Sequence, residues 1–194
     1  NLPRHYSVIA LSRLTHDYET QFEAAKRIVK FAKHSIHDKP QNYINVARAG
    51  IDFAMTADDK DTANLIKQAN DYIRQFQIAF PKTELQEQMK VINARLLYLQ
   101  DEKERARTLI EQLSGDSLDT DDFEDLLDKA KVFHALGLYE RCLEVLDEIE
   151  LRCQRNPEQG ELFLRYIKQE KKEKTAIRQT PKELNNSAVD YYQK

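Results

Sequence analysis

Residues 130–146 read AKVFHALGLYERCLEVL, and this stretch decides the fold. Ala130 and Cys142 are small residues, and each is followed at helical spacing by a larger apolar residue. Side chains three or four residues apart share one face of a helix, and a small residue lets a second helix approach closely. The stretch therefore predicts two helices that pack on each other as a hairpin.

The same pattern occurs a second time, 36 residues earlier in the chain. The matched residues, in order, are Ala94, Leu97, Ala106, Ile110 and Leu113, against Ala130, Phe133, Cys142, Leu146 and Ile149. A period of roughly 34 to 47 residues is typical of α-solenoids, in which helical hairpins stack side by side. We therefore expect an all-α fold, an α-solenoid of about ten helices.

Start and stop signals divide the chain into four hairpins and two further helices. We expect the hairpins at about residues 3–37, 42–79, 84–113 and 121–154, and the two helices at 158–174 and 181–194. All of them are expected to belong to one helical-repeat domain, 1–194. The first residue is Asn, and the last expected helix has no second helix after it. We therefore expect the chain to be a fragment of a longer protein.

Three local expectations concern the ends and surroundings of individual helices. A helix at 17–36 is expected to end before Asp38-Lys39-Pro40. The next helix, 42–57, is apolar on nearly every side, which suits a helix buried between neighbours. Thr83 and Gln86 read as a capping box, in which the threonine oxygen and the glutamine side chain accept hydrogen bonds from free backbone amides in the first turn of a helix at about 84–99.

The repeated unit resembles the tetratricopeptide repeats (TPRs). Residues 130–146 carry the small residue, the aromatic residue, the turn glycine Gly137, the tyrosine Tyr139 and the second small residue of that family in the right order. The unit at 94–113 keeps the apolar positions but has Asp101 where the glycine would be. A third, partial match closes the chain, at Pro181, Leu184, Ala188 and Tyr191.

This resemblance implies a non-enzymatic protein–protein interaction module. In such modules the first helix of each hairpin lines a concave face that binds a peptide or a helix. The partner-binding residues that the resemblance implies are Gln88, Val91, Arg95, Tyr98, Glu124, Leu127, Lys131, His134, Asn185 and Tyr192. Val91 and Leu127 occupy positions that are charged in chaperone-binding TPRs, so we do not expect a clamp for chaperone tails.

A narrower resemblance concerns the end of the chain. The stretch from Leu184 to Lys194, with the long irregular hairpins before it, is similar to the TPR output region of bacterial two-component response regulators. It implies the regulatory or output region of a signal-transduction protein, with a sensor kinase or another response regulator as the partner. The phosphorylated aspartate would then lie outside this chain.

Composition and charge bear on the other function classes. The net charge of −3 gives no general attraction to nucleic acid or to anionic lipid. No apolar run approaches the roughly 20 residues that span a bilayer, and the start of the chain does not read as a signal peptide. We expect a cytoplasmic protein. Two alternatives stay open: a nucleic-acid-binding or transcription-regulating helical repeat, and a self-association module that forms homodimers.

No residue pattern predicts catalysis, a cofactor or a metal site. His34 and His37 lack a third ligand at a suitable spacing, so we interpret them as a surface pair. The acidic residues between Asp116 and Asp128 lack the glycine and the final glutamate of an EF-hand loop, and we interpret them as a solvated helix start. The basic stretch 168–178 is interrupted by glutamates, which favours a solvated helix end.

The two cysteines, Cys142 and Cys153, fall on one predicted helix. At about 1.5 Å per residue they are roughly 16 Å apart along it, which is too far for a disulfide bond. Cys142 also occupies the small contact position of its repeat. We therefore expect buried structural thiols and no bridge between them.

Overall fold

The computed structural model describes residues 2–15, 17–113, 123–155 and 168. These residues form eight α-helices and no strand, which confirms the all-α prediction for the described part of the chain. The eight helices correspond to the first eight of the ten expected. The expected helices at 158–174 and 181–194 lie outside the described residues, apart from Lys168, which is helical.

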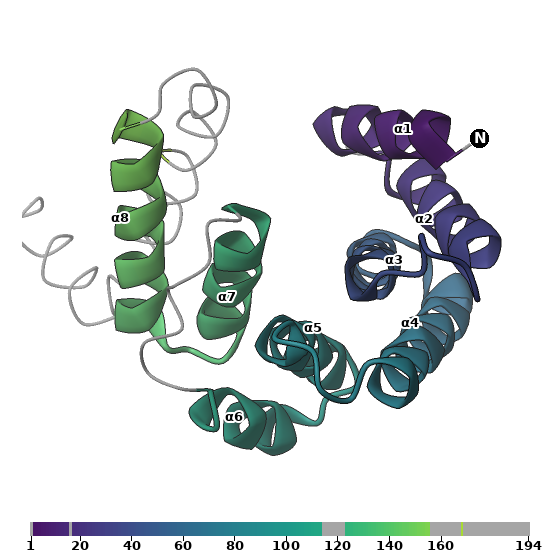
Figure 1. The fold of residues 1–194 in the computed structure, drawn as a ribbon. Coiled ribbons are helices and arrows are strands. Elements are labelled where there is room, and N and C mark those ends of the chain that lie inside the picture. The colour runs from purple at the N-terminus through teal and green to yellow at the C-terminus, as the bar shows by residue number, and fades with distance from the viewer. Residues whose placement is uncertain (1, 16, 114–122, 156–167, 169–194) are drawn as a thin grey trace, which may run out of the picture. The chain divides into compact units, whose positions relative to one another are not determined.

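The chain divides into two compact units, Asn1–Ser117 and Leu118–Lys194. The helices of the first unit are α1 (Leu2–Leu14), α2 (Tyr18–Ala32), α3 (Pro40–Ala54), α4 (Asp59–Ala79), α5 (Gln86–Leu99) and α6 (Lys103–Glu111). The second unit contains α7 (Phe123–Ala135) and α8 (Tyr139–Arg155). Consecutive helices pack in pairs, α1 on α2, α3 on α4, α5 on α6 and α7 on α8 (Figure 1).

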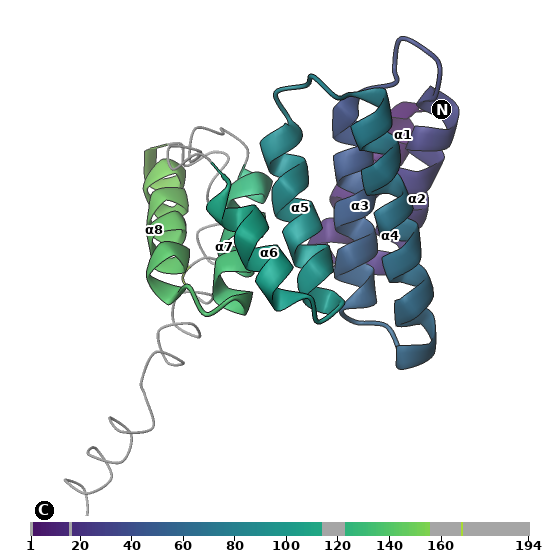
Figure 2. The ribbon, with the colours of Figure 1, turned by 90° about the horizontal axis from the view of Figure 1, so that it is seen from below.

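Helix α3 lies at the centre of the first unit. It packs on α2, α4 and α5, and these four helices run side by side in Figure 2. Ten of its fifteen residues are buried, which confirms the expectation of a helix enclosed by its neighbours. Tyr43 of α3, Phe22 of α2 and Phe76 of α4 are among the largest fully buried side chains of this core.

Gly50 marks a close approach of α3 to its neighbours. A Cβ atom at this position would lie 2.9 Å from Cε2 of Phe22 and 3.4 Å from the Cβ of Ala69. A real Cβ does not tolerate the shorter distance, so only glycine fits without displacing the Phe22 ring. The residue therefore brings the backbone of α3 against a buried aromatic ring of α2.

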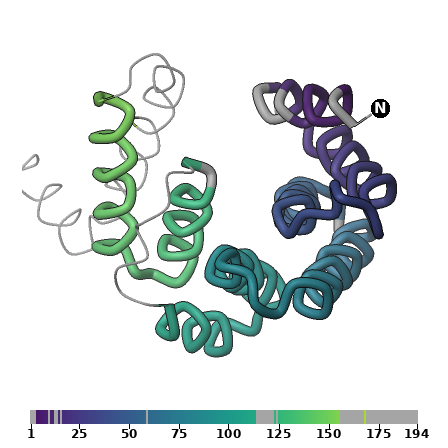
Figure 3. The backbone as a smooth tube through the Cα atoms, in the orientation of Figure 1, coloured from purple at the N-terminus to yellow at the C-terminus, as the bar shows by residue number. Residues whose placement is uncertain are grey.

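The turn between α5 and α6 follows the Schellman pattern, in which the amides of the two residues after the C-cap residue donate hydrogen bonds to carbonyls in the last turn of the helix. The Asp101 amide donates to the Tyr98 carbonyl at 3.0 Å, and the Glu102 amide donates to the Leu97 carbonyl at 2.9 Å. Asp101 has φ of 60°, in the left-handed region. Figure 3 traces the backbone from α5 through this turn into α6.

The turn between α7 and α8 is the same turn, 36 residues later. The Gly137 amide donates to the His134 carbonyl at 3.0 Å, the Leu138 amide donates to the Phe133 carbonyl at 2.8 Å, and Gly137 has φ of 75°. Every donor and acceptor therefore has its counterpart 36 positions earlier. Asp101 takes the conformation that the glycine takes in the other hairpin.

The hairpin of α7 and α8 has a small apolar core of its own. Its buried residues are Leu126, Ala130, Cys142, Val145, Leu146, Ile149 and Cys153. Both cysteines are free and buried on α8, which confirms the expectation that they form no bridge. Burial and the nearby Glu150 carboxylate raise the pKa of the Cys153 thiol, so this group stays protonated near neutral pH.

Helix α2 ends at Ala32, four residues before the expected end. The chain turns at His34, where φ is 64°. The Ser35 amide and hydroxyl both donate to the Ala32 carbonyl, and the His34 amide donates to Oδ2 of Asp38 at 3.0 Å. These side chains compete with the helix for its backbone groups. His34 and His37 are exposed, as expected, but they lie in a turn and not on a helix.

The capping box predicted at Thr83 and Gln86 is wrong. Helix α5 begins at Gln86, and no side chain caps it. The Thr83 hydroxyl accepts from the Leu85 amide at 3.3 Å, and Nε2 of Gln86 donates to the Phe80 carbonyl at 2.7 Å. Both side chains therefore close the loop that leads into the helix, and the glutamine is not available for its expected role.

Candidate protein-binding faces

The predicted partner-binding residues of α5 and α7 occupy equivalent positions. We define the α5 face as Gln88, Val91, Arg95 and Tyr98, and the α7 face as Glu124, Leu127, Lys131 and His134; the members of each pair are 36 residues apart. Their spacing of three, four and three residues places each set on one side of its helix. The Glu124 side chain lies outside the described part of the structure, as do Asn185 and Tyr192.

The α5 face is closed at its centre. Val91 and Arg95 are 2% and 5% exposed, whereas Gln88 and Tyr98 at its two ends are half-buried. Nη2 of Arg95 donates to Oδ1 of Asp52 on α3 at 2.5 Å. The guanidinium therefore joins α5 to α3 and is not displayed on an open surface.

A buried polar cluster surrounds this ion pair. Arg48 lies one helical turn before Asp52 on α3 and is 4% exposed. Burial and the Asp52 carboxylate raise the pKa of Tyr18 at the start of α2, while Arg95 acts in the opposite direction. Side chains from α2, α3 and α5 thus meet in one environment of low polarity. Charges in such a place are tolerated only with partners, so the cluster fixes how the three helices are aligned.

The α7 face is more open than the α5 face. Leu127, Lys131 and His134 are all half-buried. The His134 ring meets the Tyr139 ring edge-on, with centroids 5.6 Å apart, across the turn that Gly137 forms. An apolar, a cationic and an imidazole side chain therefore follow one another along one side of α7.

Two members of the acidic cluster depart from the sequence interpretation. Asp125 and Asp128 on α7 are 3% and 2% exposed, so the expectation of a solvated cluster is wrong for these residues. Each of them has an interaction partner. Asp116, Asp119, Asp121 and Asp122 lie outside the described residues.

Sequence reasoning identified Arg95 but missed the three side chains around it. Tyr18, Arg48 and Asp52 belong to no motif, and Arg48 and Asp52 are the only charged residues of the expected helix 42–57. One sequence signal could have revealed a buried polar site here. Arg48 and Asp52 carry opposite charges, lie four residues apart, and belong to a helix expected to be enclosed by its neighbours.

Compared with family models, with curated proteins and with solved structures, the chain gives no match. The resemblance to TPRs therefore rests on its residues. No helix within the described ranges is long and apolar enough to span a membrane.

Proposed function

We propose that this chain is a non-enzymatic protein-binding module, a TPR-like α-solenoid that contacts its partner through the first helices of its hairpins. The observation that carries the proposal is a repeated hairpin: α5 and α7 have the same register and end in the same turn, although the centre of the α5 face is buried. In helical-repeat modules the first helix of a hairpin binds a peptide or a helix. Catalysis would instead need reactive groups that converge in one pocket.

The partner contacts that we propose first are those of the α7 face. Leu127, Lys131 and His134 are held on a helix and keep part of their surface exposed. Side chains that are already ordered lose little freedom on binding, and an apolar residue next to a cation can bury area while selecting an acidic neighbour. On α5 the half-buried Tyr98 has the register position of His134 and offers an aromatic side chain of its own.

The partner class follows from the narrower resemblance of the chain. In this proposal the module is an output or regulatory region in two-component signalling, and its partner is a sensor kinase or another response regulator. Those proteins are the first to test. The proposal assigns no phosphorylated residue to this chain.

The test compares three baits made from the whole chain: the unchanged sequence, Lys131→Glu and Arg141→Glu. Arg141 is exposed on α8, so the control makes the same charge change on the other helix of the same hairpin. Capture followed by mass spectrometry should recover a protein partner with the unchanged bait and with Arg141→Glu, but not with Lys131→Glu. Equal recovery by all three baits would refute the role of the α7 face.

The same baits separate the two alternatives. Recovery of nucleic acid that is lost as salt rises would favour a nucleic-acid-binding repeat, because phosphate contacts release counterions. Recovery of a second copy of the bait, checked by light scattering, would favour self-association. Arg95→Glu is a poor bait, since it would place two carboxylates together in a buried site.

A further inference from the structure

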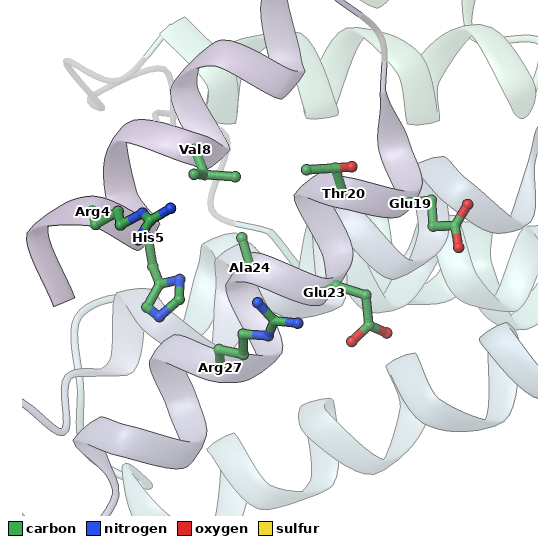
Figure 4. A pocket seen from close by; sticks show the side chains of 8 residues that line it. All are labelled: Arg4, His5, Val8, Glu19, Thr20, Glu23, Ala24 and Arg27. Atoms are coloured by element: carbon green, nitrogen blue, oxygen red, sulfur yellow. The ribbon is translucent and has the colours of Figure 1, made fainter. Parts of the chain in front are cut away.

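A cleft of about 520 Å³ lies between α1 and α2 in the first unit (Figure 4). Its walls carry five titratable side chains: Arg4 and His5 from α1, and Glu19, Glu23 and Arg27 from α2. Small-molecule sites typically have volumes of roughly 300–1,000 Å³ and combine apolar walls with a few polar groups. The cleft has the size and the mixed lining of such a site.

The charged groups are arranged in order along the cleft. Glu19, Glu23 and Arg27 are four residues apart, so they follow one side of α2. In Figure 4 Arg4 and His5 lie at one side, Glu19 lies at the other, and Arg27 and Glu23 stand between them. The cleft therefore has a basic end and an acidic end.

Within the described residues, the two arginines of the basic end are not ion-paired with the glutamates of the cleft. Glu23 is engaged by Lys26, whose Nζ lies 2.6 Å from its Oε1. Arg4 and Arg27 are exposed, and neither forms an ion pair with a residue that the structure describes. Two guanidinium groups, each with a planar set of N–H donors, thus face the same cleft. This is the arrangement that carboxylate and phosphate oxygens match.

His5 adds a fixed donor at the same end. Its ring stacks on Phe31 of α2, with centroids 5.9 Å apart and an angle of 14° between the planes. Desolvation, together with the positive charge of Arg27 and Arg4, lowers the pKa of His5. This shift favours the neutral imidazole, which can donate one N–H to an acceptor without carrying a charge of its own.

We propose that this cleft binds a small organic anion, with its carboxylate or phosphate group held between Arg4 and Arg27 and with His5 donating a further hydrogen bond. Val8 and Ala24, which also line the cleft, would contact the apolar part of the ligand. The proposal is independent of the α5 and α7 faces, because it concerns another part of the chain and another class of ligand.

Glu19 restricts which anions fit. Its carboxylate lies at the end of the cleft away from Arg4 and His5 and would repel a second acidic group there. A ligand with one anionic group is therefore preferred over one with an anionic group at each end.

The experiment titrates the whole chain with inorganic phosphate and, separately, with acetate, while NMR follows the His5 imidazole. Potassium chloride at matched ionic strength is the blank. Arg27→Gln and Arg4→Gln are compared with Arg74→Gln, a control at an exposed arginine of α4 that does not line the cleft. Circular dichroism checks that each variant keeps its helix content.

We expect a saturating shift of the His5 signal with at least one anion and none with chloride. Arg27→Gln and Arg4→Gln should each raise the dissociation constant about tenfold, because each removes a charge-assisted hydrogen bond, and Arg74→Gln should leave it unchanged. A response to only one anion identifies the head group. The proposal is overturned if chloride gives the same shift, or if Arg74→Gln weakens binding as much as Arg27→Gln does.

Discussion

Asp101 and Gly137 occupy the same left-handed turn position, 36 residues apart, with φ of 60° and 75°. Each follows the last turn of the first helix of its hairpin, and each amide donates to a carbonyl three residues earlier at 3.0 Å. Glycine adopts this conformation at no steric cost, whereas aspartate adopts it at some cost to the backbone. The turn is therefore favoured by residue type at Gly137, whereas Asp101 adopts it at a modest backbone cost.

Gly137→Ala should lower the free energy of unfolding by about 1 kcal/mol. A Cβ at this position meets no atom within 4 Å, so the cost comes from the backbone conformation alone. Gly137→Asn should cost less, since asparagine tolerates the left-handed region. Urea denaturation followed by circular dichroism measures both variants. A larger loss for asparagine than for alanine would contradict this explanation.

Breaking the ion pair between Arg95 and Asp52 should be costly. Arg95→Ala removes the guanidinium from a carboxylate that is only 13% exposed, and we expect a loss of about 3–5 kcal/mol in the free energy of unfolding. The double variant Arg95→Ala, Asp52→Ala should lose less than the sum of the two single losses. A double-mutant cycle by urea denaturation measures the difference, and strict additivity would show that the pair is not coupled.

The local spacing of residues predicted most of the helices and aligned Asp101 with Gly137. A helix is decided by contacts within a few residues, so apolar periodicity locates α3 and α5 to within a few positions. The repeat at an offset of 36 residues likewise placed Asp101 at the position of Gly137. These features depend on short stretches of chain that can be compared directly with one another.

Features that depend on distant residues could not be predicted in this way. Arg95 was expected on an open face, but its guanidinium is buried because Asp52, 43 residues earlier in the chain, pairs with it. The end of α2 depends on Asp38, whose side chain accepts from a turn amide four residues earlier. The cleft between α1 and α2 has no motif, because its residues come from two helices that meet only in the folded chain.

Gly50→Ala should destabilise the first unit by about 1–3 kcal/mol, because the added methyl group would overlap the Phe22 ring. The better helix propensity of alanine offsets roughly 1 kcal/mol of this loss. Phe22→Leu in the same chain should relieve the overlap, so Gly50→Ala should cost less in that background than in the unchanged sequence. Urea denaturation of the two single variants and the double variant tests this, and equal costs in both backgrounds would refute the contact.

Tyr43→Phe should weaken the dependence of stability on alkaline pH. Burial, and then the nearby Asp38 carboxylate, raise the pKa of Tyr43 to about 12 from its ordinary value of 10.0. Between these two values the unfolded chain loses the phenolic proton and the folded chain keeps it. Unfolding then releases a proton, so the stabilising contribution is complete below pH 10 and is lost as the pH rises toward 12.

The measurement is the free energy of unfolding at several values between pH 8 and pH 12, for both proteins. The unchanged sequence should lose about 2 kcal/mol more than Tyr43→Phe across the interval from pH 10 to 12, since each unit of pKa shift corresponds to about 1.4 kcal/mol. Tyr18 and Tyr72 also have raised pKa values, so the variant should retain part of the decline. Parallel curves for the two proteins would show that Tyr43 keeps its ordinary pKa in the folded state.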